Sequence, residues 1–456
     1  MSAAQQAKKY LFAIVTVYMC YLTHGVQAII FSQNQVDFYT QWGFTDPALG
    51  AAAVSTAIVW TGVGKFVSVW IGGEISDRIG RKIPAVCGGI LYIISFVIML
   101  ITTDATVAAV AGFATGVATS GFWDGALYPA IAEANPRQAG ATTIGIKAVI
   151  SVSGIIYPLF VAMNSNHMVE TLADGTKQVV ATANTGDWHI NIWIAIVLSV
   201  IATIFAILTP FIYDDERKQG LGPNEADKSA AKNAAEAEIQ AARDAMLEKP
   251  GFLTQAITLL YGFVIMFIMY GAQQYSKAFG INNLGLDPVA AAGMTSIYTA
   301  GSIIAVLFWA FMMGKLRWNP TKVILIDSII AICGLGIVIL ALPLGIGAGA
   351  VYVGIALLGF GAAGGMLQTG VTQRQMYCPG PRGRNVGMYY TFMGAASVFL
   401  PGIVGAMTAA TGEAQAVWVM MILLLCAAVL SLLMALFLVK EHKKLFGYSA
   451  MEKMRD

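Results

Sequence analysis

The chain has 456 residues, of which 57% are hydrophobic and 11% charged, and its formal net charge at pH 7 is +2. Since a soluble domain is about 25% charged, this composition excludes an ordinary soluble protein and predicts that lipid covers most of the surface. No basic cluster that would bind nucleic acid is present, and the five cysteines indicate no disulfide framework. The sequence has no Walker loop, metal-ligand spacing or nucleophile constellation, so we expect no enzyme, no cofactor and no metal.

Long apolar runs predict an all-α membrane protein, because a transmembrane helix needs about 20 mainly apolar residues. The first run, from Tyr10, is long enough to span and is followed by no small-residue cleavage site, so we expect no cleavable signal peptide. Twelve helices are predicted, over residues 10–32, 47–74, 83–103, 105–132, 139–163, 190–213, 251–279, 287–313, 321–343, 346–374, 385–410 and 415–439.

The distribution of Lys and Arg predicts the orientation of these helices. If both termini are cytoplasmic, the cytoplasmic segments hold nearly all Lys and Arg, and the outer side holds only Lys177 and Lys277. This is the asymmetry that the positive-inside rule requires. We therefore expect a multi-pass protein of the plasma (inner) membrane.

Several sequence marks occur twice, once in each half of the chain. Asp46-Pro47 begins the second helix and Asp287-Pro288 the eighth, and each pairs an N-cap carboxylate with a proline that the first turn tolerates. Pro158 and Pro401 fall late in the fifth and eleventh helices. This pattern predicts two parallel six-helix repeats.

The repeats set the expected domain boundaries. We expect one six-helix bundle over residues 1–213 and a second over 251–456. Residues 214–250 are rich in Ala, Glu, Lys and Arg and are predicted to form a cytoplasmic linker with a surface helix. The outer loop 164–189 is polar and is expected to form a small hairpin or cap, to which we assign no function.

A short charged run separates the second and third helices, and it must be a tight turn. It resembles the signature loop of the major facilitator superfamily, G-x-L-x-D-R-x-G-R-K, with Ile75 in place of the leucine. The matching residues are Gly73, Ile75, Asp77, Arg78, Gly80, Arg81 and Lys82. Together with the 6+6 repeat, this resemblance implies the fold of that superfamily, two pseudo-symmetric bundles that work by alternating access.

The chemistry of this motif suggests a gate. Gly73 would let the second helix approach a neighbour, and Gly80 would permit the turn. Asp77 can accept the free N–H groups at the start of the eleventh helix, and Arg81 is expected to pair with Glu133. The resemblance implies that these contacts latch the cytoplasmic side in the outward-facing state. The alternative is a topology anchor that only obeys the positive-inside rule.

Three ionisable residues lie inside predicted spans, where they mark candidate functional sites. Asp124 in the fourth helix, Lys147 in the fifth and Lys65 in the second each lie roughly two turns from the cytoplasmic end, so we expect them in one layer. Three interpretations stay open: a structural ion pair, a coupling proton on Asp124 whose affinity Lys147 tunes, or binding of a solute carboxylate or sugar hydroxyls. Asp327 in the ninth helix is expected to be a cap or an interfacial charge.

The resemblance also implies a central cavity lined by helices 1, 4, 7 and 10, with 2, 5, 8 and 11 beside them. The polar and aromatic candidates on these helices are His24, Gln27, Trp123, Tyr270, Gln273, Gln274, Gln368, Tyr389 and Tyr390. We expect Trp123 to stack on a sugar or aromatic ring and His24 to be a possible proton carrier. Hydrogen bonding between helices is the alternative role for each.

These features predict a secondary active transporter that takes up a small hydrophilic solute, such as a sugar, polyol, sugar acid or organic anion, in symport with protons. A proton-coupled exporter of amphipathic compounds, drugs or lipids is one alternative, although the fifth helix lacks the G-x-x-x-G-P-x-x-G-G run of drug antiporters. A non-transporting receptor or scaffold is another. We expect a monomer whose partners are the solute and the bilayer, with no nucleic acid.

Overall fold

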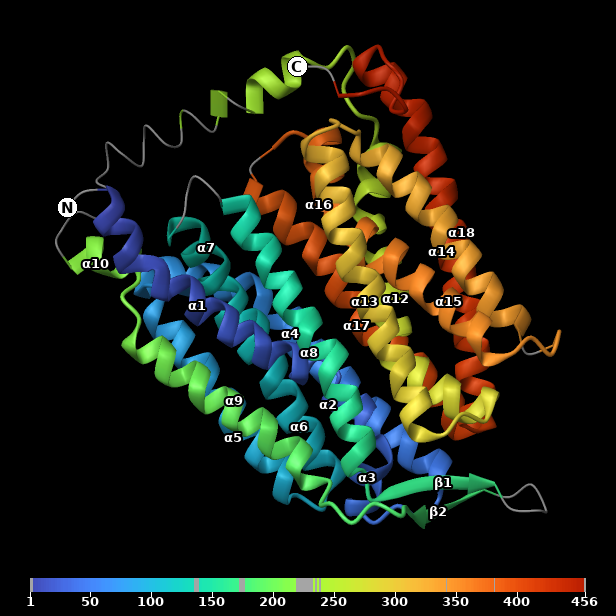
Figure 1. Cartoon of the computed structure of the whole chain (residues 1–456). Helices are drawn as coiled ribbons and strands as arrows, with labels where there is room; N and C mark the ends of the chain where they lie inside the picture. Colours follow the sequence, from blue (N-terminus) through green and yellow to red (C-terminus); the bar gives the residue numbers. More distant parts are fainter. Residues whose placement is uncertain are drawn as a thin grey trace. The chain divides into compact units, whose positions relative to one another are not determined.

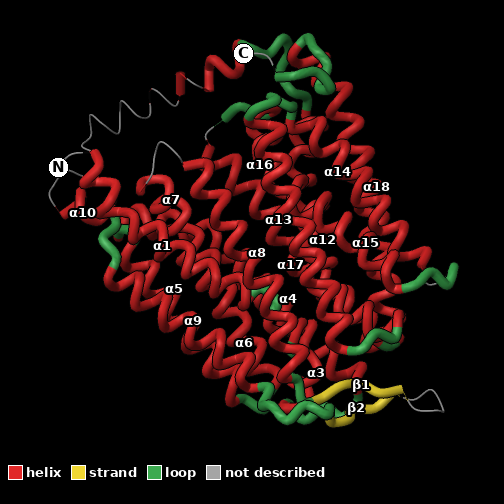
Figure 2. The backbone as a smooth tube through the Cα atoms, viewed as in Figure 1, coloured by secondary structure: helices red, strands yellow, loops and turns green. Residues whose placement is uncertain are grey.

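The computed structural model describes residues 3–134, 139–171, 177–218, 233, 236–237, 239–341, 343–380 and 382–454. Helices make up most of the described chain, and its two strands form one hairpin (Figure 2). Eleven of the described helices are long and apolar enough to cross a membrane. With α1 (Ala3–Gln27) as the first span, they give the predicted twelve-helix architecture.

The observed elements follow the predicted helices to within a few residues at most ends. The first half contains α1, α2 (Ile30–Gln33), α3 (Gln35–Gln41), α4 (Pro47–Ile79), α5 (Lys82–Ile101), α6 (Ala105–Gly116), η1 (Val117–Asp124), α7 (Gly125–Ala134), α8 (Ala139–Asn164), β1 (His167–Thr171), β2 (Lys177–Ala181), α9 (His189–Leu208) and α10 (Ile212–Lys218). The second half contains α12 (Phe252–Leu284), α13 (Pro288–Gly314), α14 (Pro320–Ala341), α15 (Ala348–Leu358), η3 (Gly359–Met366), α16 (Leu367–Tyr377), α17 (Arg382–Thr411) and α18 (Glu413–Phe446).

The repeated Asp-Pro marks begin helices as predicted. Asp46 Oδ1 accepts hydrogen bonds from the backbone N–H groups of Ala48 (2.7 Å) and Leu49 (3.1 Å) at the start of α4. Asp287 Oδ1 accepts the equivalent bonds from Val289 (2.9 Å) and Ala290 (3.1 Å) at the start of α13. Each carboxylate satisfies two of the N–H groups that a helix start leaves without a partner.

Two features of the helices were not predicted. The fourth and tenth transmembrane helices, which correspond in the two repeats, each contain an eight-residue π-helical segment, η1 and η3. π-Segments are rare and often mark functional sites, because the extra residue per turn changes which side chains face a neighbour. The second helix is also longer than expected. It runs to Ile79, so most of the charged motif is helical and only its Gly80-Arg81 step turns the chain.

The chain divides into two compact units, whose helices and strands are labelled in Figure 1. Unit 1 comprises Met1–Gly222, Gln274–Ser296 and Ser397–Trp418, and unit 2 comprises Pro223–Gln273, Ile297–Ala396 and Val419–Asp456. Within unit 1, α4 packs along α6 and η1, α5 along α9, and α1 along α8. Within unit 2, α14 packs along α15 and η3. In addition to the first half of the chain, unit 1 therefore includes the end of α12, the beginning of α13, the end of α17 and the beginning of α18.

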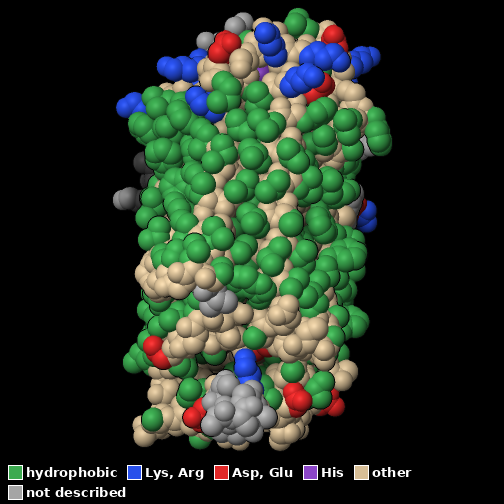
Figure 3. Space-filling model, turned by 90° about the vertical axis from the view of Figure 1, so that its right-hand side faces the viewer, with side chains coloured by type: hydrophobic (Ala, Val, Ile, Leu, Met, Phe, Trp, Pro, Cys, Tyr) green, Lys and Arg blue, Asp and Glu red, His purple; other side chains and the backbone are tan. Residues whose placement is uncertain are grey.

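The surface matches a bilayer environment. Large apolar side chains are exposed along the helices, among them Ile329 (47%) on α14, Val353 (56%) on α15 and Leu433 (58%) on α18. Figure 3 shows one face on which hydrophobic side chains cover the middle, whereas Lys and Arg gather mainly at one end. Apolar area exposed in this way would be costly in water, and lipid removes that cost.

Candidate functional site

Asp124 is the last residue of η1, and it meets α1. Tyr21 Oη donates a hydrogen bond of 2.8 Å to Asp124 Oδ1, and Ser120 Oγ donates one of 3.1 Å to Oδ2. Tyr21 is buried, whereas Asp124 is partly exposed. Each carboxylate oxygen therefore has a hydroxyl donor. Neither donor was predicted from the sequence, although Ser120 lies one helical turn before Asp124 and Tyr21 one turn before His24.

Lys65 on α4 and Lys147 on α8 are partly exposed. The charge of Lys65 interacts with that of Asp124, but neither of these described lysines forms an ion pair or hydrogen bond with the carboxylate. The structural ion pair considered from the sequence is thus not made in this conformation. The structure brings Asp124 and Lys65 within electrostatic range of each other and leaves both ammonium groups without a direct anionic partner in the described chain.

His24 and Gln27 connect α1 to α5 and to the fourth transmembrane helix. His24 Nδ1 lies 3.2 Å from Tyr92 Oη and 3.5 Å from Thr119 Oγ1. Gln27 Nε2 donates a 3.1 Å hydrogen bond to Thr115 Oγ1, and its Oε1 is buried with no hydrogen-bond partner. Interhelical hydrogen bonding therefore occupies one polar atom of each of these two candidates.

Trp123 does not share the environment of its neighbour Asp124. Its side chain has 0% exposure, and its Nε1 donates a 3.0 Å hydrogen bond to the carbonyl of Ala85 on α5. Its ring packs 4.6 Å from the ring of Tyr92. The expectation that Trp123 stacks on a solute is wrong for this conformation, because consecutive residues of a helix point in different directions.

The candidates from the second half of the chain are dispersed. Gln274 is buried and donates a 2.6 Å hydrogen bond to the carbonyl of Ala28 within unit 1. In unit 2, Tyr270 is 5% exposed and Gln273 is partly exposed. Tyr389 is buried and its hydroxyl lacks a hydrogen-bond partner, whereas Tyr390 is 43% exposed. The side chain of Gln368 lies outside the described residues.

The charged motif forms the predicted Arg81–Glu133 pair. Arg81 Nη2 lies 2.9 Å from Glu133 Oε1, and Arg81 Nη1 lies 2.6 Å from Asp77 Oδ1. Burial lowers the pKa of Arg81, but its hydrogen bonds and ion pairs with Glu133 and Asp77 outweigh burial and raise that pKa above its ordinary value. The guanidinium is therefore charged at every physiological pH. Arg78 instead makes an exposed pair of 2.7 Å with Glu74.

Two details of the motif differ from the expectation. Gly73 has no atom within 4 Å of where a Cβ would lie, and Gly72 is the residue that packs against the carbonyls of Ser120 and Gly121. Asp214, expected to belong to the linker, accepts hydrogen bonds from the backbone N–H groups of Arg81 (2.9 Å) and Lys82 (3.2 Å). It caps α5, which lacks an N-cap side chain of its own. Gly80 turns the chain as predicted, with φ 98°.

These features combine a helical bundle, a repeated architecture and the loop motif. The family model of the Major Facilitator Superfamily matches residues 12–379. The chain belongs to the major facilitator superfamily. Its members are transporters and not enzymes, and this protein is therefore a membrane transporter for a small-molecule solute.

Its relatives agree with this assignment. The inner membrane transport protein YdiM of Escherichia coli (strain K12) is 26% identical over 385 residues, which are 84% of this chain and 84% of that protein. The uncharacterized MFS-type transporter YfkL of Bacillus subtilis (strain 168) is 24% identical over 437 residues, 95% of this chain and 97% of that protein.

Solved structures of the superfamily share the fold. The crystal structure of a D-xylose-proton symporter superposes with a TM-score of 0.69 at 13% identity, over 92% of this chain and 97% of that chain. A mutant of the nucleoside transporter NupG gives a TM-score of 0.65 at 12% identity, over 94% of this chain and 99% of that chain. At these identities the likeness shows the fold alone.

A polar chain joins four elements at the hairpin end of unit 1, which we define as the end that carries β1 and β2. Lys177 Nζ on β2 donates a 2.8 Å hydrogen bond to Asn282 Oδ1, and Asn282 Nδ2 donates one of 3.1 Å to Glu413 Oε2. Gln35 Nε2 on α3 donates one of 2.6 Å to Glu413 Oε1. Transporters of this superfamily must open and close each end of the cavity. These hydrogen-bonded side chains are therefore a candidate gate.

A second contact lies at the same end. Lys277, expected on the outer surface, is 9% exposed within α12, and its Nζ donates a 2.5 Å hydrogen bond to the carbonyl of Gln33. Gln33 Nε2 in turn donates a 3.3 Å hydrogen bond to Thr295 Oγ1 on α13. The expectation of a solvated lysine is wrong because Lys277 is buried and its ammonium group bonds to the backbone of Gln33.

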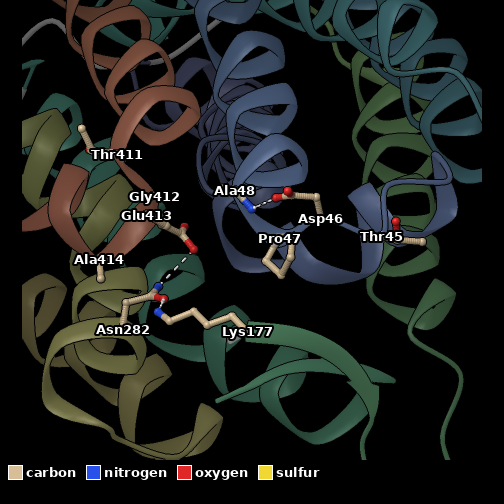
Figure 4. A pocket seen from close by; sticks show the side chains of 10 residues that line it. All are labelled: Thr45, Asp46, Pro47, Ala48, Lys177, Asn282, Thr411, Gly412, Glu413 and Ala414. Carbon is tan, nitrogen blue, oxygen red and sulfur yellow. Dashed lines mark hydrogen bonds between the residues drawn. The ribbon is translucent and has the colours of Figure 1, made fainter. Parts of the chain in front are cut away.

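A pocket adjoins the hydrogen-bonded residues Lys177, Asn282 and Glu413, as Figure 4 shows. Its volume is about 430 Å³. The lining residues are Thr45, Asp46, Pro47, Ala48, Lys177, Asn282, Thr411, Gly412, Glu413 and Ala414. Four of the lining side chains are already hydrogen-bonded: Asp46 to the start of α4, and Lys177, Asn282 and Glu413 to one another. The pocket is therefore a gap beside these bonded groups.

The predicted hairpin of the 164–189 loop is confirmed as the antiparallel pair β1–β2. Asp37 on α3 holds its base. The fully buried carboxylate accepts hydrogen bonds from Ser165 Oγ (2.5 Å) and from the backbone N–H groups of Asn166 (3.1 Å) and His167 (3.0 Å). His167 Nδ1 lies 2.8 Å from the same carboxylate. The hairpin is therefore fixed to the helix that carries Gln35.

Proposed function

We propose that the protein is a proton-coupled symporter that takes up a small hydrophilic solute, with Asp124 as the proton-binding residue. One observation carries the proposal: a partly exposed carboxylate inside a membrane span whose direct donors are two hydroxyl groups. Ionisable residues in spans mark proton relays and substrate sites. Hydroxyls both donate and accept, so Tyr21 and Ser120 can serve the ionised and the protonated acid.

The chemistry around Asp124 supports a polar solute. Lys65 and Lys147 have no direct anionic partner in the described chain, and an unpaired ammonium in a span costs free energy that a bound anion would recover. We infer that they receive a carboxylate or electron-rich hydroxyls of a sugar, sugar acid or organic anion. The fold shared with a D-xylose-proton symporter and a nucleoside transporter is compatible with this substrate class.

We further propose a role for each part of the chain. Residues 1–213 and 251–456 act as two bundles that alternate access, residues 214–250 connect them in the cytoplasm, and the hairpin end faces outward. Two relatives are described as inner membrane transport proteins, which supports the bacterial inner membrane as the location. We expect the monomer to be the transporting unit.

A two-step experiment tests the proposal. A panel of sugars, polyols and organic anions is screened for thermal stabilisation of the purified protein, and each hit is assayed for uptake into liposomes with and without an inward proton gradient. We expect uptake of at least one hit that the gradient drives above equilibrium, and loss of that accumulation in Asp124→Asn.

The matched control is Asp104→Asn, which changes an exposed N-cap carboxylate at the start of α6. Asparagine also caps helices, so this variant should transport normally. If amphipathic dyes stabilise the protein and are expelled while no polar solute binds, the symporter proposal fails in favour of an exporter. If no compound is moved at all, a receptor or scaffold role replaces it.

A further inference from the structure

Asp327 on α14 is a second acid inside a membrane span, and it is not the cap or interfacial charge expected from the sequence. Its side chain has 0% exposure. Trp309 Nε1 on α13 donates a 3.0 Å hydrogen bond to Oδ1, and Oδ2 is buried without a hydrogen-bond partner. The carboxyl group therefore has a single direct donor.

The groups around Asp327 offer it no counter-charge. On one side is η3, the glycine-rich π-segment, which carries no titratable side chain. A Cβ added at Gly365 would collide with the Asp327 carboxyl and lie 2.7 Å from Trp309 Nε1, so the helix backbone covers the acid. Tyr261 on α12 is a titratable side chain that interacts electrostatically with Asp327. Among the described residues, no Lys, Arg or His side chain pairs with it.

An ionised carboxylate in this environment would be unstable. Burying an isolated charge costs several kcal/mol or more unless it is paired and fully hydrogen-bonded, and the group takes up a proton instead. The neutral acid loses much less by burial. The structure thus favours a protonated Asp327 in this conformation.

Asp327 and Asp124 each lie beside a π-segment, one in each half of the chain. Asp124 ends the π-segment η1, and Asp327 is covered by the π-segment η3 of the corresponding helix in the second repeat. A π-segment that reverts to α-helix shifts the register of the residues around it. Such a shift in η3 would move Gly365 away from the carboxyl and admit water, which would allow the proton to leave.

We propose that Asp327 is a second proton-binding site of the transporter, in its C-terminal half, covered by Gly365 of η3 and hydrogen-bonded by Trp309. The site binds a proton when η3 packs on the carboxyl and releases it when that contact opens. This inference rests on the proposed proton coupling and adds a residue to it.

Protons are the probe in the test, and no solute is needed. The purified full-length protein in liposomes is titrated with acid and base while infrared difference spectra record the carbonyl stretch of protonated carboxyl groups. We expect a band that disappears reversibly as pH rises and that is absent from Asp327→Asn, which is nearly isosteric. Trp309 emission, obtained by subtracting the Trp309→Phe spectrum, should change over the same pH range.

Trp309→Phe tests the geometry. Since a hydrogen bond to a charged group is worth about 1.5–3 kcal/mol, removing the indole donor should move the midpoint of the band upward by about one to two pH units. Trp193→Phe is the control. It makes the same substitution on α9 in unit 1, where the Trp193 side chain is 50% exposed, so the midpoint should not move.

Three results would overturn the inference. The band in Asp327→Asn could equal that of the wild type, the band could persist until alkaline unfolding, or Trp309→Phe could leave the midpoint unchanged. A permanently protonated acid cannot carry a coupling proton. These outcomes are independent of solute transport, so they are distinct from a failure of proton-driven uptake in the Asp124 experiment.

Discussion

Gln35 Nε2 donates a 2.6 Å hydrogen bond to Glu413 Oε1, which joins α3 to the first residue of α18 across 378 positions of sequence. Asn282 and Lys177 extend this contact to α12 and β2. All four residues lie in unit 1. Hydrogen bonds thus join elements from both halves of the chain at the hairpin end. A closed gate requires such an arrangement.

Glu413→Ala should open this end more often. The change leaves the amides of Gln35 and Asn282 without their carboxylate acceptor, and hydrogen bonds to a charged group are worth about 1.5–3 kcal/mol. The closed-to-open ratio should fall about tenfold or more. In a background without the five native cysteines, a cysteine placed at buried Thr295 should react correspondingly faster with a membrane-impermeant maleimide. Glu170→Ala, an exposed carboxylate on β1, should leave the labelling rate unchanged; equal rates in both variants would exclude the gate.

Tyr21→Phe should impair transport without unfolding the protein. It removes the 2.8 Å hydrogen bond to Asp124 Oδ1 and keeps the ring packing against Tyr128. We expect proton-driven uptake to fall about tenfold, because a hydrogen bond to a charged group contributes about 1.5–3 kcal/mol. Tyr18→Phe on the same helix removes a bond to the carbonyl of Thr142 and should have little effect. Similar uptake by both variants would contradict a role of Tyr21 in the site.

Arg81→Lys should destabilise the protein although it keeps the charge. Lysine is a point donor and cannot bind Glu133, Asp77 and Ser76 together as the planar guanidinium does. We expect a loss of about 1–3 kcal/mol in the free energy of unfolding, and a coupling of about 1–2 kcal/mol in a double-mutant cycle with Glu133→Gln. Arg78→Lys is the control, because its pair with Glu74 is exposed and worth under about 1 kcal/mol. Additive effects of the Arg81 and Glu133 changes would rule out the pair as a stabilising contact.

Gly72→Ala and Gly73→Ala form a matched pair of neighbouring substitutions. A Cβ at position 72 would collide with the Gly121 carbonyl, whereas a Cβ at position 73 has nothing within 4 Å. Forcing α4 and η1 apart should cost about 1–3 kcal/mol for Gly72→Ala, and Gly73→Ala should be neutral or stabilising by up to about 1 kcal/mol. Thermal denaturation of both variants measures this difference in stability. Greater harm from Gly73→Ala would show that the motif glycine serves another contact.

Asp37→Ala should release the hairpin. Four donors from Ser165, Asn166 and His167 would lose their acceptor, and each buried unsatisfied group costs about 1–3 kcal/mol, with part of that cost relieved by water. We expect faster proteolysis of the 164–189 segment and a lower melting temperature. Gln178→Ala on the exposed part of β2 should alter neither. If Asp37→Ala is cleaved at the wild-type rate, other contacts hold the hairpin.

The sequence predicted most of the helices and the family, because those depend on local properties. Apolar length, the Asp46 and Asp287 caps and the charged motif each act within a few residues of where they are read. The π-segments escaped prediction because their hydrogen-bond register depends on the packing of η1 and η3 against neighbouring helices. Trp123 was misplaced for a related reason, since its direction relative to Asp124 is fixed by the π-turn and by α5.

The amino-acid sequence by itself determined that this is a membrane protein with two related sets of transmembrane helices. It also determined that one of these helices carries an acid, Asp124. Only the tertiary structure decided what that acid touches, that Asp214 caps α5, that Gly72 rather than Gly73 packs closely, and that Glu413 fastens to Gln35. The physical reason is range. Hydropathy and capping are sums over neighbouring residues, whereas a hydrogen bond between distant residues exists only once packing has brought two atoms within about 3 Å.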